Sequence, residues 1–226
     1  MKRSRMWFGL WMCALVLAWL AQSAPVRAAE EAAETEQPKH LVPYVPTPYD
    51  VVEEMLKMAD VKSTDVVFDL GCGDGRICVT AAKKFGARAY GVDINPERVK
   101  EARELAKKEG VENKVTITEG DVFKTDFSSA TVVTMYLLPE YNRALRPSLE
   151  KQLKVGSRVV SHDFDMPPVW KTVIEKEFTD KDGGQHSLYL WKITPEMKGK
   201  QPAAGTKKGP RTGGKGGKKR GGAPKQ

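Results

Sequence analysis

The 226-residue chain has few residues that bind metals or form cross-links: three cysteines and three histidines. Cys13 lies in an apolar N-terminal run, so only Cys72 and Cys78 remain, too few for a disulfide framework. Neither has the cysteine or histidine neighbours of a zinc motif, and we therefore expect no metal site. We expect Cys72 to be a small loop residue and Cys78 to be a core residue of a helix.

Acidic residues are missing from both ends of the chain. Residues 1–28 contain four basic residues and no acid, and residues 198–226 contain ten basic residues and no acid. The part between them has 23 basic and 29 acidic residues, a net charge of -6. The pI of 9.3 therefore reflects the ends and says little about the folded domain.

The N-terminus has the layout of a secretory leader. Basic residues precede an apolar run from Trp7 to Leu20, and small residues lead to Ala28. This run is 14 residues long, whereas a membrane span needs roughly 20. Residues 1–28 are predicted to be a signal peptide, cleaved after Ala28, which implies a periplasmic or secreted protein. An uncleaved leader would anchor the chain to the membrane and still send the domain outside.

Two further segments lack the apolar residues of a core. Residues 29–40 are polar and rich in Glu and Ala, as in a linker. From residue 197 onward Gly, Lys, Pro and Arg dominate, so residues 197–226 are predicted to be a disordered basic tail. Its charge would attract an anionic surface or nucleic acid, or would only keep the chain soluble; both interpretations stay open.

The remaining residues, 41–196, alternate short apolar strands with amphipathic helices. This pattern predicts an α/β domain with a seven-stranded, mostly parallel sheet that is covered on both faces. Two last strands joined by a glycine turn predict an antiparallel C-terminal hairpin at the sheet edge. The expected strands are 65–70, 89–92, 114–119, 130–135, 158–164, 171–178 and 187–193, and the expected helices are 49–59, 76–85, 96–109 and 140–152.

The most informative segment follows the first strand and reads Gly71-Cys72-Gly73-Asp74-Gly75-Arg76. Glycines permit positive φ and let a ligand approach the backbone, while the helix that starts here presents free N–H groups. The loop therefore suits a nucleotide-like ligand. The third glycine comes one residue too early for the dinucleotide fingerprint, with Arg76 in its place, which disfavours NAD.

A second acid lies where the same ligand would extend. Asp93 ends the next strand, 22 residues after Gly71, and is followed by Ile94 and the helix start at Asn95. A carboxylate at the tip of this strand can accept hydrogen bonds from both hydroxyls of a ribose. Asp93 alone would also suit a helix cap, but beside the glycine loop it indicates a cofactor site.

The first motif resembles that of the class I S-adenosylmethionine-dependent methyltransferases, which reads acid-x-Gly-x-Gly-x-Gly after strand one. Asp69 and the loop Gly71–Gly75 match it in full. The resemblance implies a Rossmann-like fold, S-adenosyl-L-methionine as cofactor and a loop, with Cys72 and Asp74, that cradles the methionine part. It also implies that Asp69 accepts hydrogen bonds there, often through water.

The same resemblance extends to the rest of the cofactor. Asp93 and Ile94 would bind the ribose side. Asp121 and Val122, at the end of the third strand, would form the adenine pocket. Asp121 would accept from the exocyclic amine, and Val122 or Phe123 would flank the ring.

The acceptor side is marked by the ends of the fourth and fifth strands. The fourth ends at Tyr136, without the Asn-Pro-Pro-Tyr sequence of amino-methylating DNA enzymes, which disfavours a nucleobase. The fifth ends at Ser161-His162-Asp163-Phe164. His162 and Asp163 could be acid/base groups, or polar caps of a loop.

The whole pattern resembles the small protein-lysine methyltransferases that act on the adenine nucleotide translocase and on the membrane ring of the ATP synthase. The resemblance covers about residues 42–170 and includes Tyr44-Val45-Pro46, Asp74-Gly75-Arg76 and Pro139. It implies a transferase whose methyl acceptor is a protein lysine; a small-molecule acceptor is the alternative. Tyr44 and Tyr136 are the candidate catalytic residues, lining the acceptor channel.

A different class of function competes with this one. The leader predicts a place where S-adenosylmethionine is not expected to be plentiful, so an exported binding protein that keeps the fold without activity is the alternative. The intact Asp69, glycine loop and Asp93 favour a working cofactor site.

Overall fold

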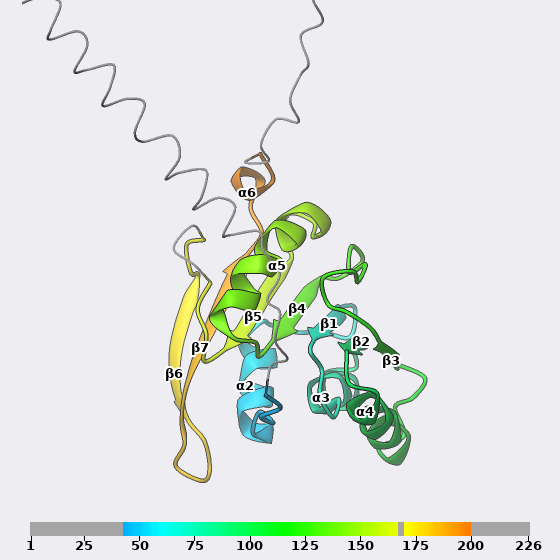
Figure 1. The fold of residues 1–226 in the computed structure, drawn as a ribbon. Helices are drawn as coiled ribbons and strands as arrows, with labels where there is room; N and C mark the ends of the chain where they lie inside the picture. The colour runs from blue at the N-terminus through cyan, green and yellow to red at the C-terminus, as the bar shows by residue number, and fades with distance from the viewer. Residues whose placement is uncertain (1–42, 167–169, 200–226) are drawn as a thin grey trace, which may run out of the picture.

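The computed structural model describes residues 43–166 and 170–199 (Figure 1). The expected signal peptide (1–28), the expected linker (29–40) and residues 200–226 of the expected tail lie outside the described residues. Within the described ranges, no helix combines the length and apolar character that crossing a membrane requires.

The described chain forms one seven-stranded sheet with the order β3-β2-β1-β4-β5-β7-β6. The first five strands in this order pair in parallel, and β7 runs antiparallel between β5 and β6. The predicted α/β, mostly parallel sheet with an antiparallel C-terminal hairpin is thus confirmed. The strands are β1 (Val66–Leu70), β2 (Arg88–Asp93), β3 (Val115–Glu119), β4 (Val132–Met135), β5 (Arg158–His162), β6 (Ile174–Thr179) and β7 (Gln185–Lys192).

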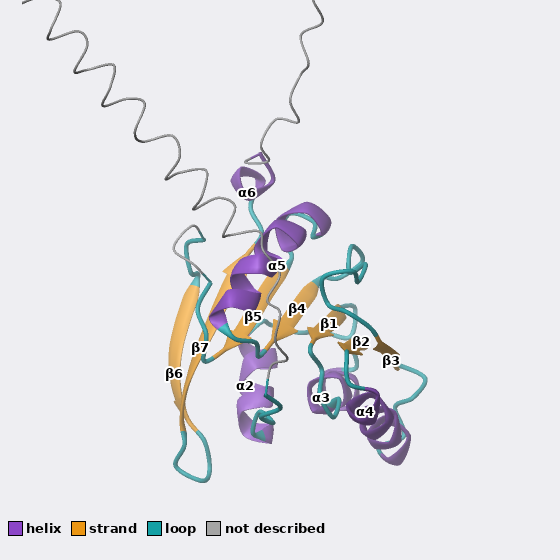
Figure 2. Cartoon of the chain, in the orientation of Figure 1, coloured by secondary structure: helices purple, strands orange, loops and turns teal. Residues whose placement is uncertain are grey.

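Helices cover both faces of the sheet (Figure 2). Those on one face are α2, α3 and α4, which share one apolar cluster, while α5 covers the other face within a second cluster. The helices are α2 (Tyr49–Met58), α3 (Arg76–Phe85), α4 (Pro96–Lys108), α5 (Pro139–Gln152) and α6 (Pro195–Gly199).

The central strand β1 shows why the sequence folds this way. All five of its residues are buried, and successive side chains of a strand point to opposite faces. Val67 belongs to the cluster under α2–α4, whereas Phe68 and Leu70 belong to the cluster under α5. A continuous apolar run is therefore what a strand covered on both faces requires, and its carboxyl end is fixed where Gly71 begins the loop.

Several predicted boundaries differ from the observed ones by one to three residues, and two of these differences have a clear cause. The fifth strand was expected to reach Phe164 but ends at His162, because Asp163 adopts a left-handed backbone with φ of +59°. The disordered tail was expected from residue 197, but α6 continues the described structure to Gly199. Met197 packs against the cluster under α5, and this contact accounts for the longer domain.

Candidate active site

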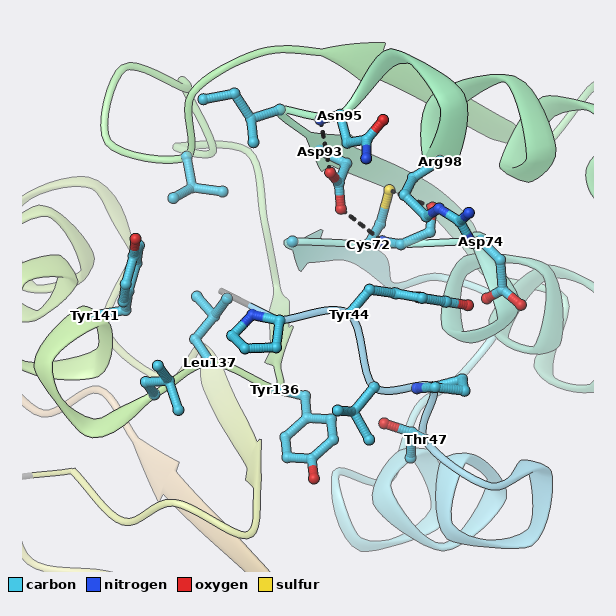
Figure 3. Close-up of a pocket in the computed structure, with 18 of the residues that line it drawn as sticks. Tyr44, Thr47, Cys72, Asp74, Asp93, Asn95, Arg98, Tyr136, Leu137 and Tyr141 are labelled. Atoms are coloured by element: carbon cyan, nitrogen blue, oxygen red, sulfur yellow. Dashed lines mark hydrogen bonds between the residues drawn. The ribbon is translucent and has the colours of Figure 1, made fainter. Parts of the chain in front are cut away.

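A cavity of about 450 Å³ opens at the carboxyl ends of the parallel strands, between the N-terminal segment 43–47 and the loops after β1 to β4 (Figure 3). This volume lies within the range of about 300–1,000 Å³ that small-molecule sites occupy. All but two of the predicted site residues line it. Those that do are Tyr44, Gly71, Cys72, Gly73, Asp74, Asp93, Ile94, Asp121, Val122 and Tyr136; the two that do not are Asp69 and Gly75.

The glycine loop is shaped by left-handed backbone conformations. Gly71 has φ of +79° and Gly73 has φ of +52°, a region that other residues rarely adopt. The backbone N–H groups of Gly71 and Cys72 both donate to the carbonyl oxygen of Val92 at 2.9 Å. A β-carbon on Gly71 would lie 2.9 Å from Leu137 Cδ2, so the loop has no room for a side chain there.

Asp93 fixes this loop as well as lining the cavity. Its Oδ2 accepts from the backbone N–H of Gly73 at 2.8 Å, and its Oδ1 accepts from the backbone N–H of Asn95 at 2.9 Å. An ionised carboxylate has about four acceptor positions, so each oxygen keeps capacity for one ribose hydroxyl. The geometry therefore fits a ribose at Asp93 and adds a structural task that the sequence did not reveal.

Asp69 does not line the cavity but lies buried at the end of β1. Its Oδ1 accepts from the hydroxyl of Thr134 at 2.8 Å, while its Oδ2 has no hydrogen-bond partner among the described residues. Burial raises the pKa of the Asp69 carboxyl to about 7, against the lowering effect of the Thr134 hydrogen bond. An unpaired buried acceptor is costly, and the cationic methionine end of the cofactor, directly or through water, would compensate it.

Gly75 also stands apart from the cavity, for a packing reason. It precedes α3 with φ of +78°, and a β-carbon there would lie 2.7 Å from Ala102 Cβ of α4. The third glycine of the motif therefore lets two helices approach each other. Gly75 is not among the residues that line the cavity, and its predicted contact with the cofactor stays a prediction.

The expected adenine end of the cavity is formed by Asp121, Val122 and Phe123. Asp121 Oδ1 accepts from the backbone N–H of Phe123 at 2.9 Å, and Asp121 Oδ2 lies 3.2 Å from Lys124 Nζ. Ile94, 56% exposed, lies at the rim. All four residues line the cavity. The contacts of Asp121, Val122 and Phe123 with adenine, and that of Ile94 with the ribose side, stay predictions.

Arg76 fastens the N-terminal segment over the glycine loop. Its guanidinium donates to both oxygens of Asp74, at 2.7 Å from Nη2 to Oδ2, and its Nη1 donates to the carbonyl oxygen of Thr47 at 2.8 Å. Such bidentate pairs are geometrically specific. The Asp74-Gly75-Arg76 sequence is thus explained as a clamp that closes one side of the cavity.

Tyr44 lies against the glycine loop rather than deep on the acceptor side (Figure 3). A β-carbon on Gly73 would lie only 2.5 Å from Tyr44 Cε2. On the Tyr44 ring lies the guanidinium of Arg98, 4.5 Å from the ring centre. Tyr44 therefore lies beside the half of the cavity where the cofactor is expected, and its catalytic role stays a prediction.

Tyr136 forms the wall on the acceptor side. Its hydroxyl donates to Asp163 Oδ2 at 3.0 Å, and its ring centre lies 4.0 Å from that of His162. Burial, together with the Asp163 charge, raises the pKa of Tyr136 to about 12, so the phenol stays neutral at physiological pH.

His162 is a buried relay of hydrogen bonds and does not line the cavity. Its Nδ1 lies 3.0 Å from Thr47 Oγ1, and its Nε2 lies 2.8 Å from Nδ1 of His186. Burial lowers the pKa of His162 to about 4, so the imidazole is neutral. Neither His162 nor Asp163 lines the cavity, where an acid/base group would have to lie; both lie behind its wall, in contact with Thr47 and Tyr136. The acid/base and loop-cap interpretations of the two residues both stay open.

Several lining residues could not be found from the motif alone. The N-terminal segment contributes Pro43, Val45, Pro46 and Thr47, and the later elements contribute Arg98, Leu138, Tyr141 and Phe164. The signal was available for Phe164, which ends the predicted fifth strand, and for Leu138, which follows Tyr136. For Arg98 the sequence holds no signal, because only the folded structure brings this helix side chain over the Tyr44 ring.

The comparisons with known proteins agree with this geometry. Residues 69–173 match the model of the ANTKMT methyltransferase domain family. A protein-lysine N-methyltransferase of Saccharolobus islandicus is 51% identical over 156 residues, covering 67% of this chain and 94% of that protein. An adenine nucleotide translocase lysine N-methyltransferase of Mus musculus is 36% identical over 141 residues, covering 62% of this chain and only 61% of that protein.

A solved structure matches as well. An RNA methyltransferase from Salinibacter ruber, in complex with S-adenosyl-L-homocysteine, is 50% identical, with a TM-score of 0.63 and coverage of 67% of this chain and 95% of that one. Fold and site thus define an S-adenosylmethionine-dependent methyltransferase with a Rossmann-like sheet. The chain belongs to the protein-lysine methyltransferase family that includes the enzyme from Saccharolobus islandicus.

Proposed function

We propose that this chain transfers the methyl group of S-adenosylmethionine to the ε-amine of a lysine in a protein. The observation that carries the proposal is the wall at Tyr136, whose hydroxyl donates to Asp163 Oδ2 at 3.0 Å. Because its hydrogen is used in that bond, the phenol oxygen has lone pairs left to accept from an amine N–H. The protein-lysine activities named for relatives support the same acceptor.

The aromatic surroundings suit a lysine side chain. Tyr141 and Phe164 line the cavity together with Tyr136, and the Tyr136 and Phe164 rings are stacked with centres 6.0 Å apart. Apolar rings accommodate the four methylene groups of lysine. Such surroundings also lower the pKa of an amine, which favours the neutral form that reacts.

The chemistry asks the protein mainly for alignment. When bound, S-adenosylmethionine supplies a methyl group on a cationic sulfur. The lysine nitrogen forms a bond to that carbon as the carbon–sulfur bond breaks, and the nitrogen then loses a proton to water. Tyr136, with its pKa raised to about 12, orients the amine through its oxygen and does not act as a base at neutral pH.

An RNA acceptor is the competing outcome, since that is what the matched Salinibacter ruber structure is named for. RNA binding relies on neutralising phosphates with basic side chains. Outside the basic ends the chain carries a net charge of -6, which favours a protein acceptor.

The test uses the full chain, methyl-labelled S-adenosylmethionine and a cell extract as acceptor. Label that resists ribonuclease and is released by protease supports the proposal, whereas label lost to ribonuclease overturns it. Tyr136→Phe should lower kcat roughly tenfold, about the value of one hydrogen bond, with cofactor Kd unchanged. Tyr90→Phe is the matched control, because Tyr90 stacks on Phe68 away from the cavity.

A further inference from the structure

Two histidines and an aspartate from different strands meet behind the Tyr136 wall. His162 ends β5, Asp163 follows it, and His186 comes from the antiparallel strand β7. His162 Nε2 lies 2.8 Å from His186 Nδ1 and 3.3 Å from Asp163 Oδ2, and His186 Nδ1 lies 3.8 Å from Asp163 Oδ1. One ligand atom from each of the three residues therefore lies within 4.8 Å of the other two.

We propose that His162 Nε2, His186 Nδ1 and the Asp163 carboxylate bind one divalent transition-metal ion, of which Zn²⁺ suits the donor set best. Zinc takes imidazole nitrogens and carboxylate oxygens at about 2.0–2.2 Å. Two such ligands at a tetrahedral angle lie roughly 3.4 Å apart, by the same bond lengths. The two imidazole nitrogens are 2.8 Å apart, and each lies near one oxygen of the Asp163 carboxylate: Oδ2 is 3.3 Å from His162 and Oδ1 is 3.8 Å from His186. Small movements of these side chains would bring the separations to that value.

The second ring nitrogen of each histidine also has a hydrogen-bond partner. His162 Nδ1 lies 3.0 Å from Thr47 Oγ1, and His186 Nε2 lies 3.0 Å from Asp180 Oδ2. Metal-binding histidines commonly donate their second N–H to a carboxylate or another oxygen, which fixes ring orientation and tautomer. Both histidines thus have the outer partners that a metal ligand needs.

Asp163 is fixed just as firmly. Its backbone has φ of +59°, and its N–H donates to the carbonyl oxygen of Ser187 at 2.7 Å. Its Oδ1 accepts from the backbone N–H of Ser187 at 3.0 Å, and its Oδ2 accepts from Tyr136. The carboxylate is therefore oriented by two strands before any ion arrives.

Exposure and charge suit a cation at this place. The His162 side chain is 1% exposed, whereas those of His186 and Asp163 are 14% and 27% exposed, so an ion has an open side from which to enter. The carboxylates of Asp163 and Asp180 lie beside the two imidazoles, and a dication there would have carboxylate partners.

Without an ion the same atoms form a hydrogen-bonded chain, which is the rival explanation. His186 donates from Nε2 to Asp180, so its Nδ1 accepts from His162 Nε2–H, and Thr47 donates to His162 Nδ1. Metal binding needs only that the His162 proton move from Nε2 to Nδ1 while the Thr47 hydroxyl turns to accept. The number of bound protons stays the same.

A bound ion would influence the cavity through the two lining residues that contact its ligands. Thr47 and Tyr136 both line the cavity, and each contacts one of the proposed ligands. A bound ion would tie β5, β7 and the N-terminal segment together, and it would stabilise the fold because it binds only the folded chain.

The test titrates the full chain, first treated with EDTA, with Zn²⁺ and separately with Mg²⁺, followed by calorimetry and thermal denaturation. One equivalent of Zn²⁺ should bind and raise Tm, whereas Mg²⁺ should do neither, because it prefers oxygen ligands. His186→Asn should abolish the effect. His40→Ala, at the third histidine of the chain, is the control and should retain it.

Asp180→Asn is a second variant. It changes a residue in the turn between β6 and β7 and leaves the three proposed ligands in place. Loss of the outer carboxylate should weaken Zn²⁺ binding about 10- to 100-fold, and it decides the matter if His186→Asn fails to fold. The proposal is overturned if wild type binds no Zn²⁺, or if His186→Asn and Asp180→Asn, as folded proteins, bind it as tightly as wild type does.

Discussion

The carboxylate of Asp93 accepts a hydrogen bond from the backbone N–H of Gly73 at 2.8 Å. The acid at the end of β2 and the glycine loop after β1 are therefore one structural unit. A change at either residue should affect the place of the cofactor as a whole.

Asp93→Asn should weaken S-adenosylmethionine binding by about 1 to 3 kcal/mol, measured by calorimetry. An amide has one acceptor oxygen, so its NH₂ group would face either the ribose or the N–H of Gly73 or Asn95. Glu119→Gln, the same chemical change at the exposed end of β3, is the control. Equal affinities of the Asp93 variant and wild type would show that the ribose is bound elsewhere.

Gly73→Ala should reduce cofactor affinity at least tenfold. The added β-carbon would lie 2.5 Å from Tyr44 Cε2 and would therefore displace the Tyr44 ring. Gly110→Ala is a matched control: Gly110 has φ of +67°, and no atom lies within 4 Å of the β-carbon position. Both variants suffer the backbone strain, about 1–2 kcal/mol, but only the first has the clash. If both lose affinity equally, the Tyr44 contact is irrelevant.

Cofactor affinity should rise between about pH 5.5 and pH 7.5, following the Asp69 pKa of about 7. Below that pKa the buried carboxyl is protonated, and a cationic ligand favours the ionised form, so binding releases a proton. Affinity then increases with pH and levels off above the pKa. Calorimetry in two buffers measures the proton release; Asp69→Asn should remove both effects, and a pH-dependent Asn variant would assign them to another group.

Deleting residues 200–226 should leave cofactor affinity unchanged and remove retention on heparin at low salt. The deleted segment has nine basic residues and no acid, and it leaves α6 intact. Charge attraction fades as the Debye length falls from about 10 Å at 0.1 M salt to about 3 Å at 1 M. Retention that survives the deletion would place an anion-binding surface on the domain itself.

The expected signal peptide predicts where the mature chain begins. Protein isolated from its native host should begin at residue 29, as N-terminal mass spectrometry would show, and should be found outside the cytoplasm. A chain that keeps Met1 and stays in the cytoplasm would contradict the prediction and remove the conflict with cofactor supply.

The sequence predicted the sheet and most of the cavity because local signals carry both. A buried strand such as β1 is a continuous apolar run, and the loop Gly71–Gly75 is contiguous, so their placement follows from neighbours along the chain. Contacts between distant segments gave no such signal. Gly75 faces Ala102, which lies 27 residues later in the sequence, and no sequence motif predicts this contact.

The histidine pair shows the same limit. His162 pairs in register with Leu188, so His186 reaches it only because β7 returns antiparallel beside β5. The strands were predicted, but their register depends on packing over the whole sheet. The expectation of no metal site considered residues close in sequence, whereas these ligands are 24 positions apart.

The most direct measurement for the lysine acceptor is tandem mass spectrometry of the proteins and RNA of a cell extract incubated with the full chain and trideuteromethyl-labelled cofactor. The transferred group should lie on lysine ε-nitrogens, transfer by the Tyr136→Phe variant should fall roughly tenfold, and transfer by Tyr90→Phe should equal that of wild type. Label found on nucleobases, or on side chains other than lysine, would contradict it.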